Sequence, residues 1–335
     1  MENQSILIVG TGALATLFAA RLTQAGHHIS MLGTWQDGLN ALRENGARLI
    51  DAKGNEQSYS VHVTNSPNDC RGIKNAIVLV KSWQTERAAC QLADCLAEDG
   101  LAITLQNGLG NREVLKKFLD LPLTTESTEQ KQKKDSVNSV VKSSFSRIAL
   151  GTTTTGATSL GPGLVKAGGE GMISIEAHPA LGPMEEALKS AKFHVDIVKD
   201  VRSLLWGKLV INAAINPLTA LLRVPNGELL KRPAARTLMR ALAEEAAAVA
   251  SAEKVKLPFE NPAAAVEDVA RKTATNHSSM LQDIARGAPT EIDAICGAVT
   301  QAGQSHGIPT PINEACWQLV KALVPTSENS PADNQ

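Results

Sequence analysis

The longest apolar stretch of the chain, residues 204–219, carries three polar side chains at helical spacing. Lys208, Asn212 and Asn216 are four residues apart, so they share one narrow face of the predicted helix. Two interpretations are open. In one, the lysine extends to solvent and the asparagines are hydrogen-bonded core amides. In the other, the three line a cleft, and the ammonium group of the lysine points at an anionic or carbonyl substrate.

The beginning of the chain predicts a nucleotide-binding turn. A short apolar run at residues 5–9 predicts a buried strand, and residues 17–25 are helical in character. Between them the chain reads Gly10, Thr11, Gly12, Ala13, Leu14 and Ala15. A G-x-G-x-x-A turn between a strand and a helix is typical of dinucleotide-binding domains. Gly10 permits the tight turn, Gly12 lets the backbone approach a pyrophosphate, and Ala15 keeps helix and strand close.

The tip of the second predicted strand, residues 28–32, bears on the choice of cofactor. In such domains an acidic residue there binds the 2′-hydroxyl of NAD, and a basic one accommodates the 2′-phosphate of NADP. Neither is present, because Thr34 stands in this place and Arg43 comes only further along the chain. The missing carboxylate disfavours NAD. We therefore expect NADP, bound by the Thr34 hydroxyl and nearby backbone N–H groups, with Arg43 as a further candidate.

Short apolar runs alternate with helical stretches up to about residue 199, which predicts a parallel sheet covered by helices. The pattern predicts strands at 48–51, 58–64, 75–80, 101–105, 147–151 and 195–198, and helices at 36–45, 85–98 and 184–191. Strands 48–51 and 58–64 are expected to pair around the turn at 53–55. The polar segment 121–146 lacks periodicity and is expected to be a flexible insertion.

Two polar residues follow predicted strands directly, Lys81 after 75–80 and Asn107 after 101–105. Open α/β sheets bind their ligands at the carboxyl ends of the strands, so both are candidate cofactor contacts, with Asn107 beside the nicotinamide. The alternatives are a solvated lysine and an ordinary Asn-Gly turn.

The pattern is helical almost throughout after residue 200, and the tail at 325–335 is expected to be disordered. Helices are predicted at 236–253, 262–272, 279–284, 291–306 and 312–323. The expected fold is therefore α/β, with a Rossmann-type doubly wound sheet in residues 1–199 followed by an all-α substrate domain in residues 200–324.

Composition narrows the class of protein. The 335 residues are enough for two domains, and a formal net charge of −1 argues against a nucleic-acid or membrane-surface partner. The five cysteines have no C-x-x-C spacing, so we expect neither disulfides nor a metal site, which fits a cytoplasmic protein. No signal peptide is recognisable, and no apolar run was expected to cross a membrane.

Together these motifs resemble the ketopantoate reductases (2-dehydropantoate 2-reductases), which share the 6-phosphogluconate-dehydrogenase-like architecture. The resemblance extends over nearly the whole chain except the insertion and the tail. It rests on the segments GTGALA, VKSWQ, QNGLG, GTTTTGAT, WGKLVINAAINPLTAL, PNGEL, NHSSMLQDI and TEIDAICG. Thr34 departs from the family pattern, which has a basic residue there. The resemblance implies NADPH-dependent reduction of 2-dehydropantoate to pantoate, in pantothenate biosynthesis.

The resemblance also implies roles for individual residues. Lys208 corresponds to the catalytic lysine, and Glu291 to a glutamate that couples the cofactor to domain closure. The residues that correspond to further substrate contacts are Asn212, Asn216, Asn226, Asn276 and Ser279. The cofactor contacts are expected to come from residues 10–15, Thr34, Lys81, Asn107, Ala157 and Glu291.

Chemistry supports this assignment, because a lysine beside a ketone oxygen stabilises the charge formed on hydride transfer and can supply the proton. Two other functions stay open: reduction of another branched 2-oxo acid on the same scaffold, and a non-catalytic NADP-binding sensor. The partner expected in every case is a small molecule, and the oligomeric state is left open, with a homodimer as one option.

Overall fold

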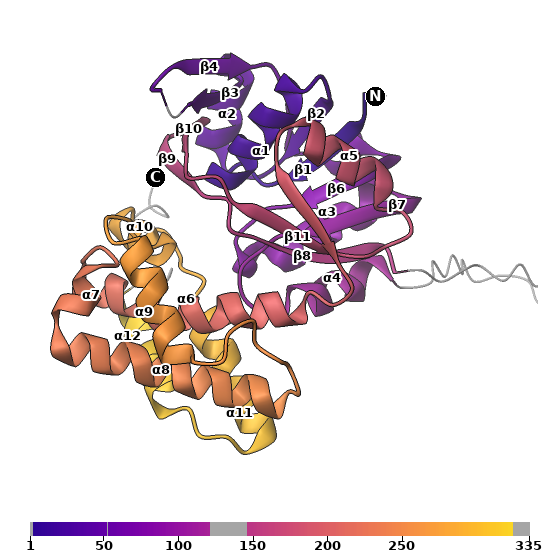
Figure 1. Cartoon of the computed structure of the whole chain (residues 1–335). Helices are drawn as coiled ribbons and strands as arrows, with labels where there is room; N and C mark the ends of the chain where they lie inside the picture. The colour runs from indigo at the N-terminus through magenta and orange to yellow at the C-terminus, as the bar shows by residue number, and fades with distance from the viewer. Residues whose placement is uncertain (1–2, 52, 121–145, 324–335) are drawn as a thin grey trace, which may run out of the picture.

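The computed structural model describes residues 3–51, 53–120 and 146–323. The predicted tail, and the predicted insertion up to residue 145, lie outside these residues. The chain forms an α/β domain followed by a domain of helices, which lie beside each other in Figure 1. The predicted fold class is confirmed.

An eight-stranded sheet forms the centre of the α/β domain, in the order β12-β11-β8-β7-β6-β1-β2-β5. The strands are β1 (Ser5–Val9), β2 (His28–Leu32), β5 (His62–Thr64), β6 (Ile73–Val78), β7 (Leu96–Thr104), β8 (Ile148–Thr153), β11 (Met172–Glu176) and β12 (His194–Val198). Neighbours from β8 to β5 are parallel, whereas β11 is antiparallel to β8. The chain builds β1, β2 and β5 in one direction and then returns to β6, so the strand order reverses between β1 and β6. Ligands bind at such a switch point.

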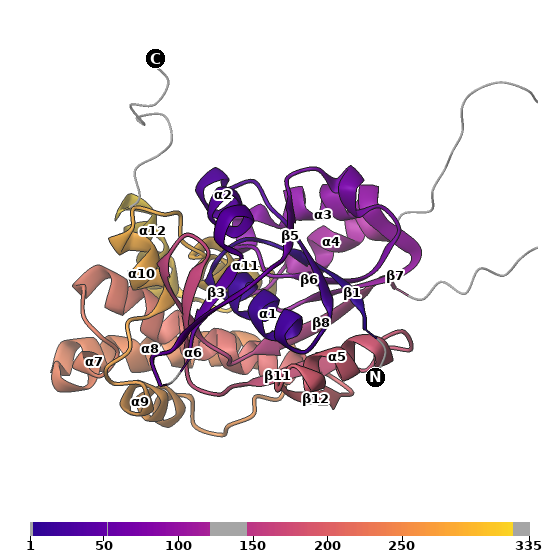
Figure 2. The ribbon, with the colours of Figure 1, turned by 90° about the horizontal axis from the view of Figure 1, so that it is seen from above.

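The alternation of side chains along β1 explains why helices cover both faces of this sheet. Ile6 and Ile8 pack in a core with α1 (Ala13–Gln24), α2 (Gln36–Asn45) and α5 (Gly182–Ser190). Leu7 and Val9 point to the other face and pack with α3 (Thr85–Cys95) and α4 (Asn111–Leu119). Figure 2 shows α1 and α5 on one side of the strands and α3 and α4 on the other.

Three predicted elements differ in the structure. The predicted strand 58–64 is divided, because the chain turns at residues 60–61 and continues from one sheet into another. Its first part is β4 (Glu56–Tyr59), which pairs with β3 (Ala47–Ile50) as expected, and its second part is β5 in the main sheet. Helix 85–98 ends at Cys95, since Leu96 already begins β7. Helix 291–306 is a π-helical turn, Asp293–Gly297, followed by α11 (Ala298–His306).

A smaller sheet, in the order β4-β3-β10-β9, flanks the nucleotide-binding side of the domain. Its other strands are β9 (Ala157–Gly161) and β10 (Leu164–Ala167). The glycine-rich segment at 161–163 forms the turn between these two strands. Strand β10 pairs in parallel with β3, so two segments more than 100 residues apart form one sheet.

The helical domain is built around α6 (Arg202–Leu222), which begins below β8 and β11 and extends into the helices (Figure 1). The surrounding helices are α7 (Glu228–Lys231), α8 (Pro233–Ala252), α9 (Pro262–Lys272), α10 (Ser279–Ala285), α11 and α12 (Pro311–Leu323). Among the described residues, α6 alone has the length and hydropathy of a membrane span, contrary to the expectation that no run qualifies. Its most apolar window is 72% buried in the protein, which is typical of a central core helix.

A carboxylate on α8 holds the start of α12. Glu245 accepts the backbone N–H groups of Ile312 and Asn313, both at 2.9 Å. Negative charge at a helix N-terminus satisfies unpaired donors and interacts favourably with the helix dipole. The same carboxylate accepts the side-chain amide of Asn313, which is fully buried.

We predict that Glu245→Gln lowers the free energy of unfolding by about 1–2 kcal/mol, because it removes the charge and one acceptor. Urea denaturation at neutral pH measures the effect. Glu244→Gln is the matched control, since Glu244 is the exposed neighbour on the same helix. Equal stability of the two variants would contradict this assignment.

Candidate active site between the two domains

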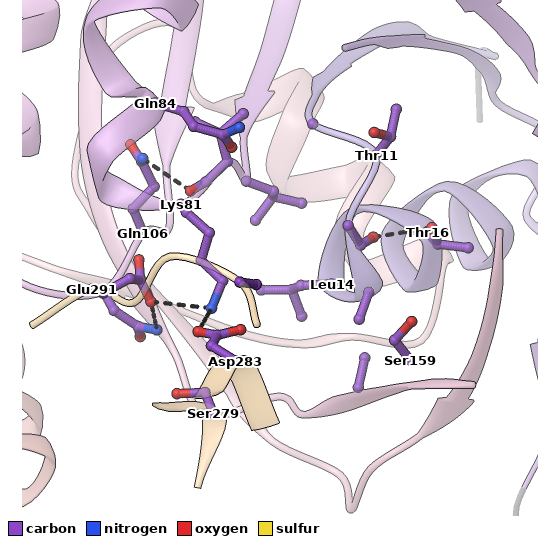
Figure 3. A pocket seen from close by; sticks show the side chains of 18 of the residues that line it. Thr11, Leu14, Thr16, Lys81, Gln84, Gln106, Ser159, Ser279, Asp283 and Glu291 are labelled. Atoms are coloured by element: carbon purple, nitrogen blue, oxygen red, sulfur yellow. Dashed lines mark hydrogen bonds and ion pairs between the residues drawn. The ribbon is translucent and has the colours of Figure 1, made fainter. Parts of the chain in front are cut away.

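A cavity of about 670 Å³ lies between the domains, at the carboxyl ends of the parallel strands. The α/β domain contributes the Gly10–Leu14 turn, the tip of β2, the segments after β6 and β7, and the β9–β10 hairpin. The helical domain contributes Lys208 and residues between Ser279 and Glu291. Figure 3 shows these side chains converging from both domains, with Thr11 and Gln84 at the end opposite Ser279.

The turn after β1 has the geometry needed for close approach of a phosphate. Gly10 has φ of +130°, and a Cβ on it would lie 3.2 Å from the carbonyl carbon of Leu79, so another residue would be strained there. Gly12 precedes α1, and a Cβ on it would meet no atom within 4 Å, which leaves open space above the helix N-terminus. Ala15 is completely buried and does not line the cavity. It belongs to the core that contains Ile6 and Ile8 of β1, in agreement with its predicted packing role.

At the tip of β2, Thr34 and Trp35 line the cavity, as does Ala157 on β9. Arg43 does not line it. Its guanidinium donates to the carbonyl oxygen of Val63 and to Asn40, both at 3.4 Å. The sequence-based suggestion that Arg43 helps to bind a 2′-phosphate is therefore not supported by its position.

An ionic cluster crosses the cleft between the domains (Figure 3). Lys81 Nζ lies 2.6 Å from Oδ2 of Asp283 and 3.7 Å from Oε2 of Glu291. Glu291 also accepts the backbone N–H of Ser82 at 3.1 Å and the Asn107 side-chain amide at 3.0 Å. The predicted sites Lys81, Asn107 and Glu291 are thus brought together from three separate segments, and all of them line the cavity.

Asp283 was not among the predicted site residues, although its carboxylate is buried in this cluster. It pairs with Lys81 and also with Arg286 Nη2, at 2.9 Å. A buried carboxylate without cations nearby would be costly, so the two pairs explain its burial. Periodicity could have revealed Asp283, because it lies among the apolar positions of the amphipathic segment 279–284. The other lining residues that the sequence analysis did not single out include Gln84, Arg87, Gln106, Thr153 and Arg286.

Lys208 reaches from α6 towards the sheet. Its Nζ donates to the carbonyl oxygen of Thr153, at the end of β8, with a distance of 2.6 Å. Withdrawal of the ammonium group from water lowers the pKa of Lys208 to about 8, and the nearby charge of Glu291 opposes this shift. A lysine with this pKa can release a proton near neutral pH, which an ordinary lysine does far less readily.

The predicted asparagines lie beyond the cavity. Asn212 and Asn216 continue the stripe along α6, with Asn216 buried, but neither lines the cavity. Asn226 and Asn276 lie together, since the backbone N–H of Asn226 donates to the Asn276 carbonyl at 3.0 Å. Of the predicted substrate contacts, only Lys208 and Ser279 line the cavity.

Ser278, beside Ser279, fixes the start of α10. Its hydroxyl accepts the backbone N–H of Leu281 at 3.1 Å and lies 2.7 Å from the hydroxyl of Thr219 on α6. It thereby joins the two segments that carry the polar stripe and Ser279.

The doubly wound sheet, the dinucleotide turn and a lysine reaching across the cleft define a two-domain, nucleotide-dependent oxidoreductase. The chain belongs to the ketopantoate reductase family. The model "Ketopantoate reductase PanE/ApbA" matches residues 6–180, and "Ketopantoate reductase PanE/ApbA C terminal" matches residues 200–324.

Curated relatives match almost the full length. The chain is 32% identical to the 2-dehydropantoate 2-reductase of Archaeoglobus fulgidus, with 96% of this chain and 99% of that one covered. It is 29% identical to that of Vibrio cholerae, with 95% and 97% covered. The structure of a PanE/ApbA family ketopantoate reductase from Ralstonia eutropha is similar, with 28% identity, a TM-score of 0.82 and 96% and 98% coverage. D-mandelate dehydrogenase with NADH and anilino(oxo)acetate, at 23% identity and a TM-score of 0.82, shares the fold, with 96% and 98% covered.

The backbones of the two domains come close to each other at Gly108. The backbone N–H of its neighbour Leu109 donates to the carbonyl oxygen of Ala294 at 3.3 Å. A Cβ on Gly108 would overlap the same carbonyl group. Gly110 shares the positive φ of Gly108 but faces open space.

We predict that Gly108→Ala holds the domains apart, whereas Gly110→Ala does not. Both variants should lose about 1 kcal/mol of stability from the left-handed backbone. Only Gly108→Ala should also increase the radius of gyration in small-angle scattering. An unchanged radius for Gly108→Ala would contradict the proposed contact.

Proposed function

We propose that this protein catalyses the NADPH-dependent reduction of 2-dehydropantoate to pantoate, a step of pantothenate and coenzyme A biosynthesis. The observation that carries the proposal is the placement of Lys208. It lies in the cleft where the nucleotide-binding turn and the helical domain meet, and it has a pKa of about 8. Membership of the ketopantoate reductase family supports this choice of substrate.

The residues of the cleft suit hydride reduction of a 2-oxo acid. NADPH, when bound, supplies the hydride to the carbonyl carbon. As the C=O double bond opens, negative charge develops on its oxygen, and the Lys208 ammonium stabilises that charge and gives the oxygen a proton. The product is a 2-hydroxy acid, and the neutral lysine regains its proton from solvent.

Other residues bind and orient in this proposal. Gly10 and Gly12 leave room for the pyrophosphate, and Lys81, Asn107 and Glu291 lie along the cofactor path. Thr155 also lines the cavity, and its buried hydroxyl has no partner among the described residues. For the substrate carboxylate and hydroxyl, we assign Ser279 at the cavity together with Asn212, Asn216, Asn226 and Asn276 behind it.

Steady-state oxidation of NADPH with ketopantoate tests the proposal. The matched substrate is 3,3-dimethyl-2-oxobutanoate, which lacks only the 4-hydroxyl group. Preference for ketopantoate supports the assignment, and equal turnover indicates a reductase of other branched 2-oxo acids. Absence of turnover with every 2-oxo acid, while NADPH still binds, would favour the sensor function.

We propose the cytoplasm as the location, a reducing compartment that suits the unpaired thiols. Burial raises the pKa of Cys95 to about 12 and that of Cys316 to about 11. Such thiols are protonated and unreactive at neutral pH.

Lys208→Ala should lower kcat by roughly 10²- to 10⁴-fold, the usual range for a lost general acid. Binding of NADPH, measured by fluorescence titration, should stay close to that of the starting protein, because the turn after β1 is untouched. Lys199→Ala is the control, since Lys199 is exposed and does not line the cavity. Turnover near the original rate in Lys208→Ala would refute the role of this lysine.

The pKa of Lys208 also predicts the pH dependence. Reduction needs the protonated lysine, so kcat/KM for ketopantoate should fall as pH rises through about 8. Glu291 raises the pKa of Lys208, so Glu291→Gln should move this alkaline limb to lower pH. A limb that stays in place or moves to higher pH would show that Lys208 is not the titrating group.

A further inference from the structure

We propose that Arg87, in the first turn of α3, binds the 2′-phosphate of NADPH in this protein and takes the place of a basic residue after β2. The inference rests on the proposed function only in taking NADPH as the ligand. It starts from an unusual feature of the adenosine end of the cavity, where the β2 tip offers Thr34, a neutral hydroxyl. Neutral donors bind a phosphate more weakly than charged ones, by about a factor of two in energy.

Arg87 differs from the other cationic residues of the cavity, because each of those has a partner within the protein. Four cationic side chains line the cavity: Lys81, Arg87, Lys208 and Arg286. Lys81 and Arg286 both pair with Asp283, and Lys208 donates to Thr153. Among the residues that the structure describes, none forms a hydrogen bond or ion pair with Arg87. This exposed guanidinium therefore remains available to an anionic ligand.

The position of Arg87 fits the adenosine half of the cofactor. A dinucleotide binds in the crevice where the strand order reverses, with its adenosine ribose at the tip of the second strand. Since β2 and β6 flank β1 on opposite sides, the segment after β6 forms the wall across from Thr34. Arg87 follows Gln84 by three residues, so the two share one side of the α3 start, and both line the cavity.

Hydrogen bonds hold the start of α3, the helix that carries Arg87, in place. The Thr85 hydroxyl donates to the carbonyl of Ser82, and the Gln106 amide donates to the Thr85 hydroxyl, both at 2.8 Å. The helix N-terminus adds partial positive charge close to Arg87. Glu86, the acidic neighbour, is exposed and does not line the cavity.

Two tryptophans mark this end of the cavity as a site for an aromatic base. Trp35 follows the β2 tip and Trp83 follows β6, and both line the cavity although they are 45% and 51% exposed. The Trp35 ring lies against Gly38, so its position is fixed by α2. An adenine between these walls gains stacking contacts. Thr34 and Arg87 would then hold the ribose 2′-phosphate, since a guanidinium can bind two phosphate oxygens at once.

Isothermal titration of the full chain with adenosine 2′,5′-bisphosphate and with adenosine 5′-monophosphate tests the inference without turnover. The two probes differ only in the 2′-phosphate. Arg87→Ala should weaken binding of the bisphosphate by roughly ten- to a hundredfold and leave that of the monophosphate nearly unchanged. Arg87→Lys, which keeps the charge but not the paired donors, should lose less.

Arg43→Ala is the matched control, since Arg43 is the basic residue nearest in sequence to the β2 tip but does not line the cavity. A loss with Arg43→Ala instead, or an equal loss for both probes with Arg87→Ala, would overturn the inference. Circular dichroism of each variant checks folding. Bisphosphate binding that depends on Arg87, together with no reduction of ketopantoate, contradicts the proposed function alone. Reduction with NADPH that is indifferent to Arg87 contradicts this inference alone.

Discussion

The arrangement of the cleft depends on two buried carboxylates, Asp283 and Glu291, at the face of the helical domain. Each would be unfavourable without a partner in a site withdrawn from water. Lys81, Asn107 and the backbone N–H of Ser82 are partners from the other domain, and Asp283 also pairs with Arg286 of its own domain. Contact between the domains therefore supplies partners to both carboxylates. The groups involved follow β6 and β7, which are rigid strands in the centre of the sheet.

The same electrostatics set the character of Lys208. Desolvation alone would favour a neutral lysine, which could not donate a proton. The charge of Glu291 opposes that effect, and the balance is a pKa of about 8. An opened cleft would return the ammonium to water and its pKa towards the ordinary value. The pKa of Lys208 thus depends on how the two domains enclose its ammonium group.

The two ends of the cavity differ in whether their polar side chains have partners within the protein. At the end with Lys208, charged groups are paired with each other across the domains. At the end beside the β2 tip, two exposed tryptophans, a threonine and an arginine without a partner among the described residues line the cavity. Paired charges favour a defined geometry, whereas exposed polar and aromatic groups are hydrated and can exchange that water for a ligand.

The sequence by itself determined the fold class, the nucleotide-binding turn and the face of α6 that carries Lys208. These features follow from local patterns: the period of apolar residues, the glycines of one turn and i, i+4 spacing. Tertiary structure alone decided which distant residues meet. Asp283 pairs with Lys81, a contact over 202 positions that no local pattern contains. The division of residues 58–64 between two sheets has the same origin, since strand partners depend on how the whole chain packs. The sequence does not show which of Arg43 and Arg87 faces the cavity. The packing of α2 and α3 decides this, because Arg87 lines the cavity and Arg43 does not.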